Sequence, residues 1–166
     1  NNQVSRFFQI DENKPYEYYS DFFIPKEEYY TLTSKYSFTP DNTLKMLRIY
    51  IRLSYRLPVV LIGEAGVGKT KLLETLAHIT GNKLLTLQMH AGTTATDIRA
   101  IINTATSLAD DEVESSGASV WVLFDEANTS SCVHKVAELL LERTLDDKPI
   151  DPRLRLILTA NPRRTM

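Results

Sequence analysis

The sequence predicts an α/β fold in which a parallel sheet is flanked by helices. Two observations support this class. From residue 58 onward, short apolar runs of strand length alternate with longer segments whose apolar residues recur at helical spacing. A glycine-rich motif at residues 63–70 also stands between the first apolar run and the helical segment that follows it. Strand, loop and helix therefore come in the order that a phosphate-binding loop requires.

The motif, GEAGVGKT, fits the P-loop pattern Gly-x-x-x-x-Gly-Lys-Ser/Thr. Its glycines let backbone N–H groups surround a polyphosphate. Lys69 can reach the β- and γ-phosphates and assist catalysis, and Thr70 can ligate Mg²⁺. A chance match is the alternative, and the flanking strand and helix argue against it. We expect nucleotide binding by Gly63, Glu64, Ala65, Gly66, Val67, Gly68, Lys69, Thr70 and Lys71.

Residues 1–38 form an aromatic-rich N-terminal arm with poor periodicity. So many aromatic side chains are seldom left in water. We expect the arm to pack on its own domain or on a neighbouring one; a binding platform for a separate partner is the alternative. Residues 39–166 would then form the α/β nucleotide-binding subdomain.

The elements of that subdomain follow in order. Thr39-Pro40-Asp41 predicts a helix start, because a capping Thr precedes Pro and an acid. The apolar face of this helix is expected at Leu44, Leu47, Ile51 and Tyr55. A strand at 58–62 and a helix at 71–79, ended by Gly81, flank the P-loop.

Further strands are predicted at 83–89, 119–124 and 153–160. A helix capped within 93–96 should run through Leu108, and the polar segment 110–117 should be a loop. A helix at 131–145 is expected to bury one face, and Trp121 is expected to pack against a helix. That face comprises Val133, Val136, Ala137, Leu140 and Leu141.

Two acids directly follow the strand predicted at 119–124. Downstream of a P-loop, Asp125 and Glu126 fit the Walker B pattern. Asp125 would hold Mg²⁺ and Glu126 would orient and deprotonate the attacking water. Asn161 ends the last predicted strand, at the sheet edge where ligands bind, so we expect it to hold the water or the γ-phosphate; a turn-forming Asn before Pro is the alternative. Asn128 either bonds to Glu126 or caps the next helix.

Other reactive residues give weaker signals. Arg143, Arg163 and Arg164 are candidates for an arginine finger that acts on a neighbour's γ-phosphate, and the finger could also lie after residue 166. His78, His90 and His134 are scattered without zinc spacing. Cys132 has no partner pattern for nucleophilic catalysis.

Composition bounds the remaining functions. The 166 residues suit one domain, and the net charge of −2 gives no reason to expect nucleic acid. No apolar run is long enough to cross a bilayer. Cys132 is the single cysteine, which favours a reducing, cytoplasmic setting. The abrupt ends of the chain suggest a piece of a longer polypeptide.

The P-loop, Asp125-Glu126 and Asn161, in that order, resemble the core of an AAA+ ATPase. Three further phrases, at residues 38–46, 90–94 and 125–129, resemble the mysterin family of giant AAA+ proteins. Members of that family carry several AAA+ units and a RING finger and act as ubiquitin ligases. The similarity covers about residues 38–162.

The resemblance implies a strand order of 5-1-4-3-2, with this chain ending before the fifth strand and the helical lid. It implies ATP and Mg²⁺ as cofactors and neighbouring AAA+ units of the parent chain as partners. It also implies a ubiquitin-conjugating enzyme as a partner of the parent. We expect an ATPase unit; the alternatives are a nucleotide-gated interaction module with little hydrolysis and a dynein- or midasin-like remodelling unit.

Overall fold

The computed structural model describes residues 39–113 and 119–162, so the arm at 1–38 and Arg163 and Arg164 lie outside the described residues. The elements are α4 (Pro40–Ser54), β1 (Val59–Ile62), α5 (Lys69–Ile79), β2 (Lys83–Gln88), α6 (Ala95–Val113), β3 (Val120–Asp125), the 3₁₀ helix η1 (Ala127–Thr129), α7 (Val133–Glu142), β4 (Thr144–Leu145), β5 (Lys148–Pro149) and β6 (Leu154–Ala160). None of the described helices is long and apolar enough to cross a membrane.

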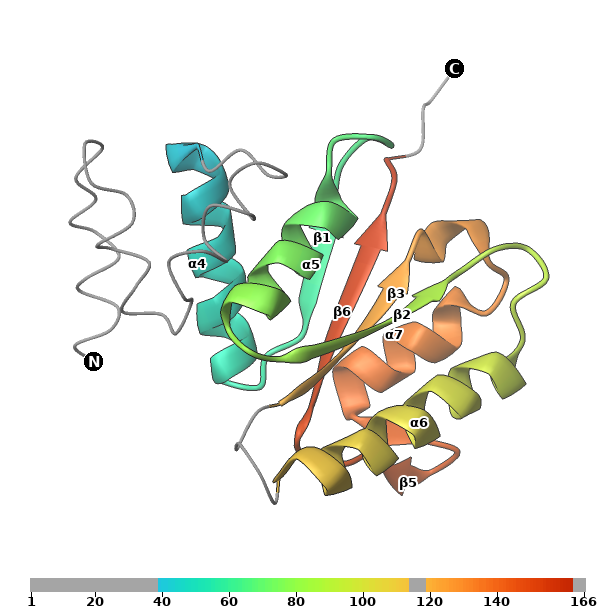
Figure 1. Ribbon diagram of the computed structural model, residues 1–166. Helices are drawn as coiled ribbons and strands as arrows, with labels where there is room; N and C mark the ends of the chain where they lie inside the picture. Colours follow the sequence, from blue (N-terminus) through green and yellow to red (C-terminus); the bar gives the residue numbers. More distant parts are fainter. Residues whose placement is uncertain (1–38, 114–118, 163–166) are drawn as a thin grey trace.

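Four parallel strands form the central sheet, in the order β1-β6-β3-β2 (Figure 1). Counting only these strands along the chain, the order is 1-4-3-2, as expected for the first four strands of the predicted fold. Because all four strands run the same way, their carboxyl ends share one edge. That edge carries Gly63 after β1 and Asn161 after β6.

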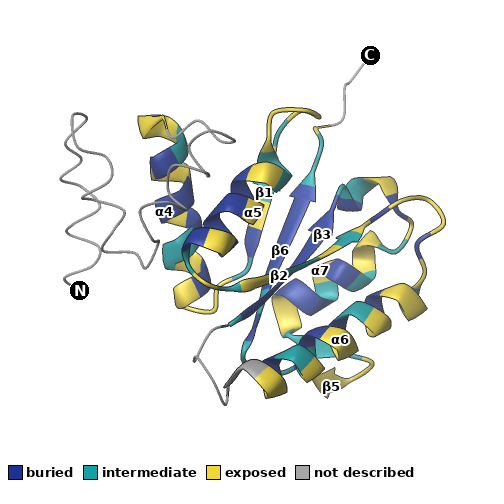
Figure 2. Cartoon of the chain, viewed as in Figure 1, coloured by how far each residue is buried: buried dark blue, intermediate teal, exposed yellow. Residues whose placement is uncertain are grey.

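The sheet separates two apolar cores (Figure 2). Helices α4 and α5 pack on one face with Trp121, Leu123 and Ile157. Helices α6 and α7 pack on the other face with alternate residues of β3 and β6. Every residue of β3 is buried, as expected of a strand covered on both faces. Trp121 therefore packs on the face that α4 and α5 cover, as the expectation of packing against a helix requires.

Two helix starts follow from capping chemistry. Thr39 Oγ1 accepts from the Asn42 N–H at 3.2 Å and begins α4, as predicted. Thr94 and Asp97 cap α6 reciprocally: the Thr94 N–H donates to the Asp97 carboxylate at 2.8 Å, and the Asp97 N–H donates to Thr94 Oγ1 at 3.4 Å. The Thr94 N–H and the Thr94 hydroxyl both donate to the Asp97 carboxylate, and these two bonds lower the pKa of Asp97.

The predicted apolar face of α4 is partly wrong. Leu47 is buried, but Leu44 and Tyr55 are exposed, and Met46, Ile49 and Leu53 are buried instead. Both sets recur every three or four residues, so periodicity alone permits either face. The contact with α5 and β1 selects the second set.

The predicted helix at 131–145 is also too long. Helix α7 ends at Glu142, and a short antiparallel hairpin, β4–β5, follows it. Val136 and Leu140 are buried as expected. Val133, Ala137 and Leu141 are exposed, and Leu139 is buried in their place. Helix α6 continues to Val113, through part of the segment predicted as a loop.

The candidate nucleotide-binding site

The P-loop connects β1 to α5 beside the end of β6. The Gly63 N–H donates to the Ala160 carbonyl at 3.2 Å, which ties the start of the loop to the last residue of β6. Gly66 and Gly68 have φ angles of 79° and 83°, a region that costs other residues roughly 1–2 kcal/mol. Gly68 is the N-cap of α5 and carries no capping side chain. The loop thus leaves the positive end of a helix dipole open to an anion.

Lys69 is the first residue of α5, and its side chain reaches back to the start of the loop. Its ammonium nitrogen donates to the Gly63 carbonyl at 2.6 Å, to the Glu64 carbonyl at 2.9 Å and to Asn161 Oδ1 at 3.0 Å. These three acceptors match the three N–H donors of an ammonium group. The start of the loop therefore surrounds the Lys69 ammonium, which also contacts Asn161, the residue that follows β6.

Asp125 joins β3 to the P-loop helix. It is the last residue of β3 and is 6% exposed. Its Oδ2 accepts from Thr70 Oγ1 at 2.9 Å, and its Oδ1 accepts from Thr159 Oγ1. A carboxylate and a hydroxyl in contact supply the hard oxygen ligands that Mg²⁺ prefers, so the donor set present here fits that ion.

Glu126 is held between the ends of β2 and β6. Its backbone is in the left-handed region, with φ 54°, and its N–H donates to Thr159 Oγ1 at 2.9 Å. One carboxylate oxygen accepts from Gln88 Nε2 and the other from Asn161 Nδ2, both at 3.3 Å. Gln88 was not predicted as a site residue. The signal for it is its position at the end of β2, paired in register with Asp125.

Asn161 bridges the cation and the carboxylate. Its Oδ1 accepts from Lys69 while its Nδ2 donates to Glu126. The amide orientation is fixed because an ammonium only donates and a carboxylate only accepts. Asn128 takes neither of its two expected roles: it pairs with the backbone of Asn161, and Cys132 is the N-cap of α7.

Several predicted residues lie apart from this cluster. The Lys71 ammonium pairs with Glu74 on the exposed side of α5, at 3.1 Å. Arg143 follows α7 and donates to the carbonyls of Asp151 and Leu154. Leu154 begins β6, whereas Asn161 follows its end, so Arg143 lies at the far end of that strand. Its pKa is lowered by burial and by the nearby Arg56.

Apart from Thr70 and Asp125, the described side chains that could bind a metal ion do not form a cluster. Within residues 39–113 and 119–162, no group of three or more His, Cys, Asp or Glu could hold a metal ion. The ring of His90 accepts from the Gly92 N–H at 3.1 Å instead, and Cys132 is half-buried beside the core of α6 and α7.

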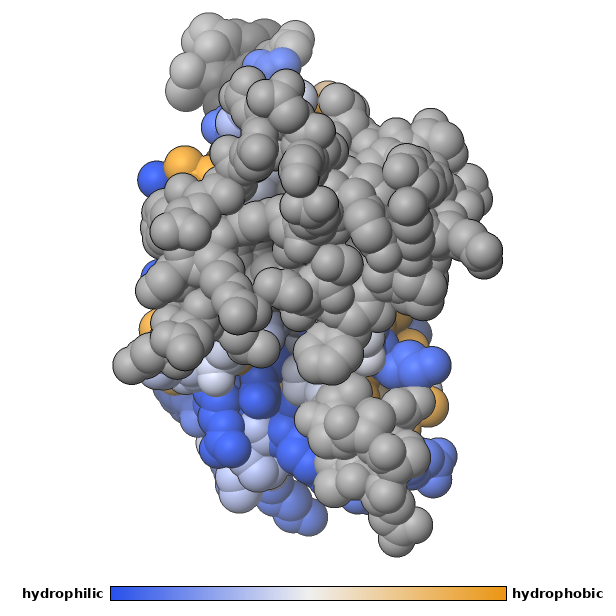
Figure 3. All heavy atoms as spheres, turned by 60° about the vertical axis from the view of Figure 1, so that its left-hand side comes forward, coloured by the Kyte–Doolittle hydropathy of each residue, from blue (hydrophilic) through white to orange (hydrophobic). Residues whose placement is uncertain are grey.

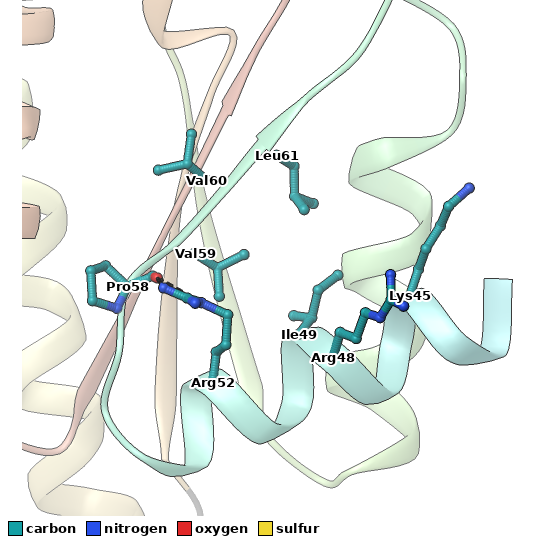
Figure 4. Close-up of a pocket in the computed structure, with 8 residues that line it drawn as sticks. All are labelled: Lys45, Arg48, Ile49, Arg52, Pro58, Val59, Val60 and Leu61. Atoms are coloured by element: carbon teal, nitrogen blue, oxygen red, sulfur yellow. Dashed lines mark hydrogen bonds between the residues drawn. The ribbon is translucent and has the colours of Figure 1, made fainter. Parts of the chain in front are cut away.

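A separate groove of about 480 Å³ lies between α4 and the start of β1 (Figure 4). Ile49, Val59 and Leu61 supply apolar lining, and Lys45, Arg48 and Arg52 add positive charge. The Arg52 guanidinium donates to the Pro58 carbonyl. No residue of the P-loop lines this groove. In the space-filling view of Figure 3, the described residues that can be seen are mostly hydrophilic.

The sheet order and the P-loop between β1 and α5 define an AAA+ type P-loop α/β fold. A family model described as the RNF213 AAA domain matches residues 36–164. The chain belongs to this family, and the expected likeness to a mysterin-type AAA unit is confirmed.

Three relatives are E3 ubiquitin-protein ligases named RNF213 or rnf213-beta. The chain is 31% identical to the Danio rerio protein and 32% identical to those of Homo sapiens and Mus musculus, in each case over 136 residues. Each match covers 78% of this chain but only 3% of the relative. Among solved structures, the chain matches that of C. elegans PCH-2 with a TM-score of 0.46 and 16% identity, over 77% of this chain and 39% of that chain.

Proposed function

We propose that this chain binds ATP with Mg²⁺ and hydrolyses the ATP as one AAA+ unit of a larger protein. The observation that carries the proposal is a single hydrogen-bonded cluster at the carboxyl edge of the sheet. Three separate segments of the chain contribute to it. Its members are Lys69, Thr70, Asp125, Glu126 and Asn161.

The P-loop residues would hold the triphosphate. Lys69 would exchange its carbonyl acceptors at Gly63 and Glu64 for oxygens of the β- and γ-phosphates. The open N-terminus of α5 adds favourable dipole charge. Thr70 and Asp125 would hold Mg²⁺, which supplies charge neutralisation for the phosphoryl oxygens when it is bound.

Hydrolysis would depend on Glu126 and Asn161. The Glu126 carboxylate would orient the attacking water and accept its proton. Asn161 contacts both Lys69 and Glu126, so it is placed to align the water and the γ-phosphate with the two charged groups. Nothing in the P-loop distinguishes adenine from guanine, and the choice of ATP rests on membership of the AAA family.

At the level of the parent protein, we propose a ubiquitin ligase of the RNF213 type. The names of the relatives support this assignment. Neighbouring AAA+ units and a ubiquitin-conjugating enzyme would then be its partners, and nucleotide turnover here would move neighbouring units as rigid bodies.

Lys69→Ala in the parent chain tests nucleotide binding. We expect the affinity of this unit for ATP to fall about 10- to 100-fold, because a charged donor to several phosphate oxygens is removed. Crosslinking of an azido-ATP analogue, mapped to peptides of this chain, measures the affinity of this unit alone. The exposed Lys148→Ala variant is the charge-matched control. Equal labelling of the Lys69→Ala variant and the control would contradict the proposal.

A further inference from the structure

The hydrogen bonds of the Asn128 side chain go to Asn161, the residue that bridges Lys69 and Glu126. Asn128 lies within η1, the short 3₁₀ helix that follows Glu126, and is half-buried. Its Oδ1 accepts from the Asn161 N–H at 3.1 Å, and its Nδ2 donates to the Asn161 carbonyl at 3.0 Å. One side-chain amide therefore satisfies both backbone groups of a single residue 33 positions away.

This pairing extends the sheet beyond its last backbone pair. The register between β3 and β6 ends at Phe124 and Leu158, because the chain turns away from β6 at Glu126, whose φ is positive. The Asn128 amide then offers β6 the donor and acceptor that a neighbouring strand would have supplied. On the other side of β6, the Gly63 N–H bonds to Ala160. The end of β6 is thus clamped between the P-loop and Asn128.

The chemistry explains why asparagine suits this position. An amide carries a donor and an acceptor at the spacing of a peptide group, whereas aspartate has only acceptors when ionised. An ionised aspartate would keep the bond from the Asn161 N–H but would repel the Asn161 carbonyl. Pro162 acts in the same direction as Asn128, because a residue before proline is held in an extended conformation.

We propose that Asn128 is a positioning residue that fixes the Asn161 backbone so that the Asn161 side chain spans Lys69 and Glu126. The inference rests on the proposed ATPase function. It adds a residue that acts through Asn161 rather than on the nucleotide.

Asn128→Asp in the parent chain tests this role, with the exposed Asn103→Asp on α6 as a control of identical chemistry. We expect kcat of this unit to fall about 10- to 100-fold, because misplacing a reacting group by about 1 Å has this effect. KM should stay within about threefold, since the P-loop is unchanged. Turnover that depends on this unit is obtained by subtracting the rate of the Lys69→Ala variant.

The pH dependence separates positioning from general damage. When protonated, the introduced aspartic acid can donate to the Asn161 carbonyl while still accepting from its N–H. The kcat of the variant relative to wild type should therefore rise as pH is lowered from about 7 to about 5, where the protonated fraction of a carboxyl with an ordinary pKa of about 3.9 becomes appreciable. The proposal would be overturned if Asn128→Asp had the kcat of the wild type. It would also be overturned if the ratio of the two kcat values did not change with pH, or if KM rose in proportion to the loss of kcat.

Hydrogen exchange gives a second readout that needs no hydrolysis. In Asn128→Ala, amide exchange in peptides covering residues 158–162 should be about tenfold faster than in wild type or Asn103→Ala. Unchanged exchange would overturn the proposal for Asn128 whether or not the unit turns over ATP. A different result would separate the two proposals. If exchange were faster in Asn128→Ala but the wild-type parent showed no Lys69-dependent turnover, the proposed function would be contradicted, whereas the pairing of Asn128 with the Asn161 backbone would still be supported.

Discussion

At the scale of single residues, one buried hydroxyl links the two acids of the site. Thr159 has no exposed surface. Its Oγ1 donates to Asp125 and accepts from the Glu126 N–H. The same hydroxyl thereby orients a proposed metal ligand and stabilises the left-handed backbone of the proposed general base. A threonine at this point in β6 is part of the site although it would touch no substrate.

Thr159→Val should destabilise the chain by about 1–3 kcal/mol, because the substitution leaves a buried carboxylate oxygen and a backbone N–H without a partner. Urea unfolding of this chain measures the loss. Thr104→Val, at an exposed position of α6, should change the free energy of unfolding by less than about 0.5 kcal/mol. A Thr159→Val variant as stable as that control would show that the hydroxyl is dispensable.

The sequence predicts some of these residues and misses others for a physical reason. The P-loop and the Asp125-Glu126 pair follow apolar strands in short local patterns, so they can be recognised without coordinates. Thr159, Gln88 and Asn128 contact their partners across 34, 38 and 33 residues. Only the order and register of the strands bring such residues together, and no local pattern encodes them.

At the scale of elements, strand order was predictable and helix boundaries were less so. Right-handed crossovers and buried apolar runs restrict a parallel sheet to few arrangements, and the four strands of the central sheet take the expected one. The β4–β5 hairpin was missed because Thr144 and Leu145 continue a helical pattern. Asp146 and Asp147, both with positive φ, form the turn of this hairpin. Aspartate pairs are a weaker turn signal than Asn-Gly or Asp-Gly.

Asp147→Gly should stabilise the hairpin by about 0.5–1 kcal/mol, because glycine adopts a φ of 62° without steric cost. The Arg99–Asp146 ion pair, at 2.5 Å, is retained in this variant. Ala100→Gly is a control of opposite sign, since it places glycine at an exposed position inside α6 and should destabilise by about 1 kcal/mol. Thermal unfolding compares the two; a lower midpoint for Asp147→Gly would refute the turn assignment.

At the scale of the whole molecule, Arg153 links two elements at the end of the sheet opposite the candidate nucleotide site. Its guanidinium bonds to the Asp151 carboxylate, to Asp110 at 2.5 Å and to the Ala109 carbonyl at 3.0 Å. It thereby ties the end of α6 to the loop before β6. The hydrogen bonds from Arg153 lower the pKa of Asp151 below its ordinary value, against the opposing effect of burial.

Asp151→Asn should change the acid stability of the chain. A carboxyl whose folded pKa is depressed contributes stability above its unfolded pKa of about 3.9, and that stability is lost as pH falls through the folded pKa. The variant should therefore be less stable than wild type at neutral pH and lose less stability below about pH 4. Urea unfolding across this range tests the sign. Parallel pH profiles for the two proteins would contradict the account.

The central claim is that the cluster at the carboxyl edge of the sheet hydrolyses ATP, and Glu126→Gln tests it most directly. In the parent chain, this variant should retain ATP bound to this unit, because the P-loop is intact, and lose its Lys69-dependent turnover by about 100-fold or more. Glu142→Gln, at the exposed end of α7, should turn over ATP at the wild-type rate. Retained ATP with no ADP formed is the predicted result; unchanged ADP production by Glu126→Gln would contradict it.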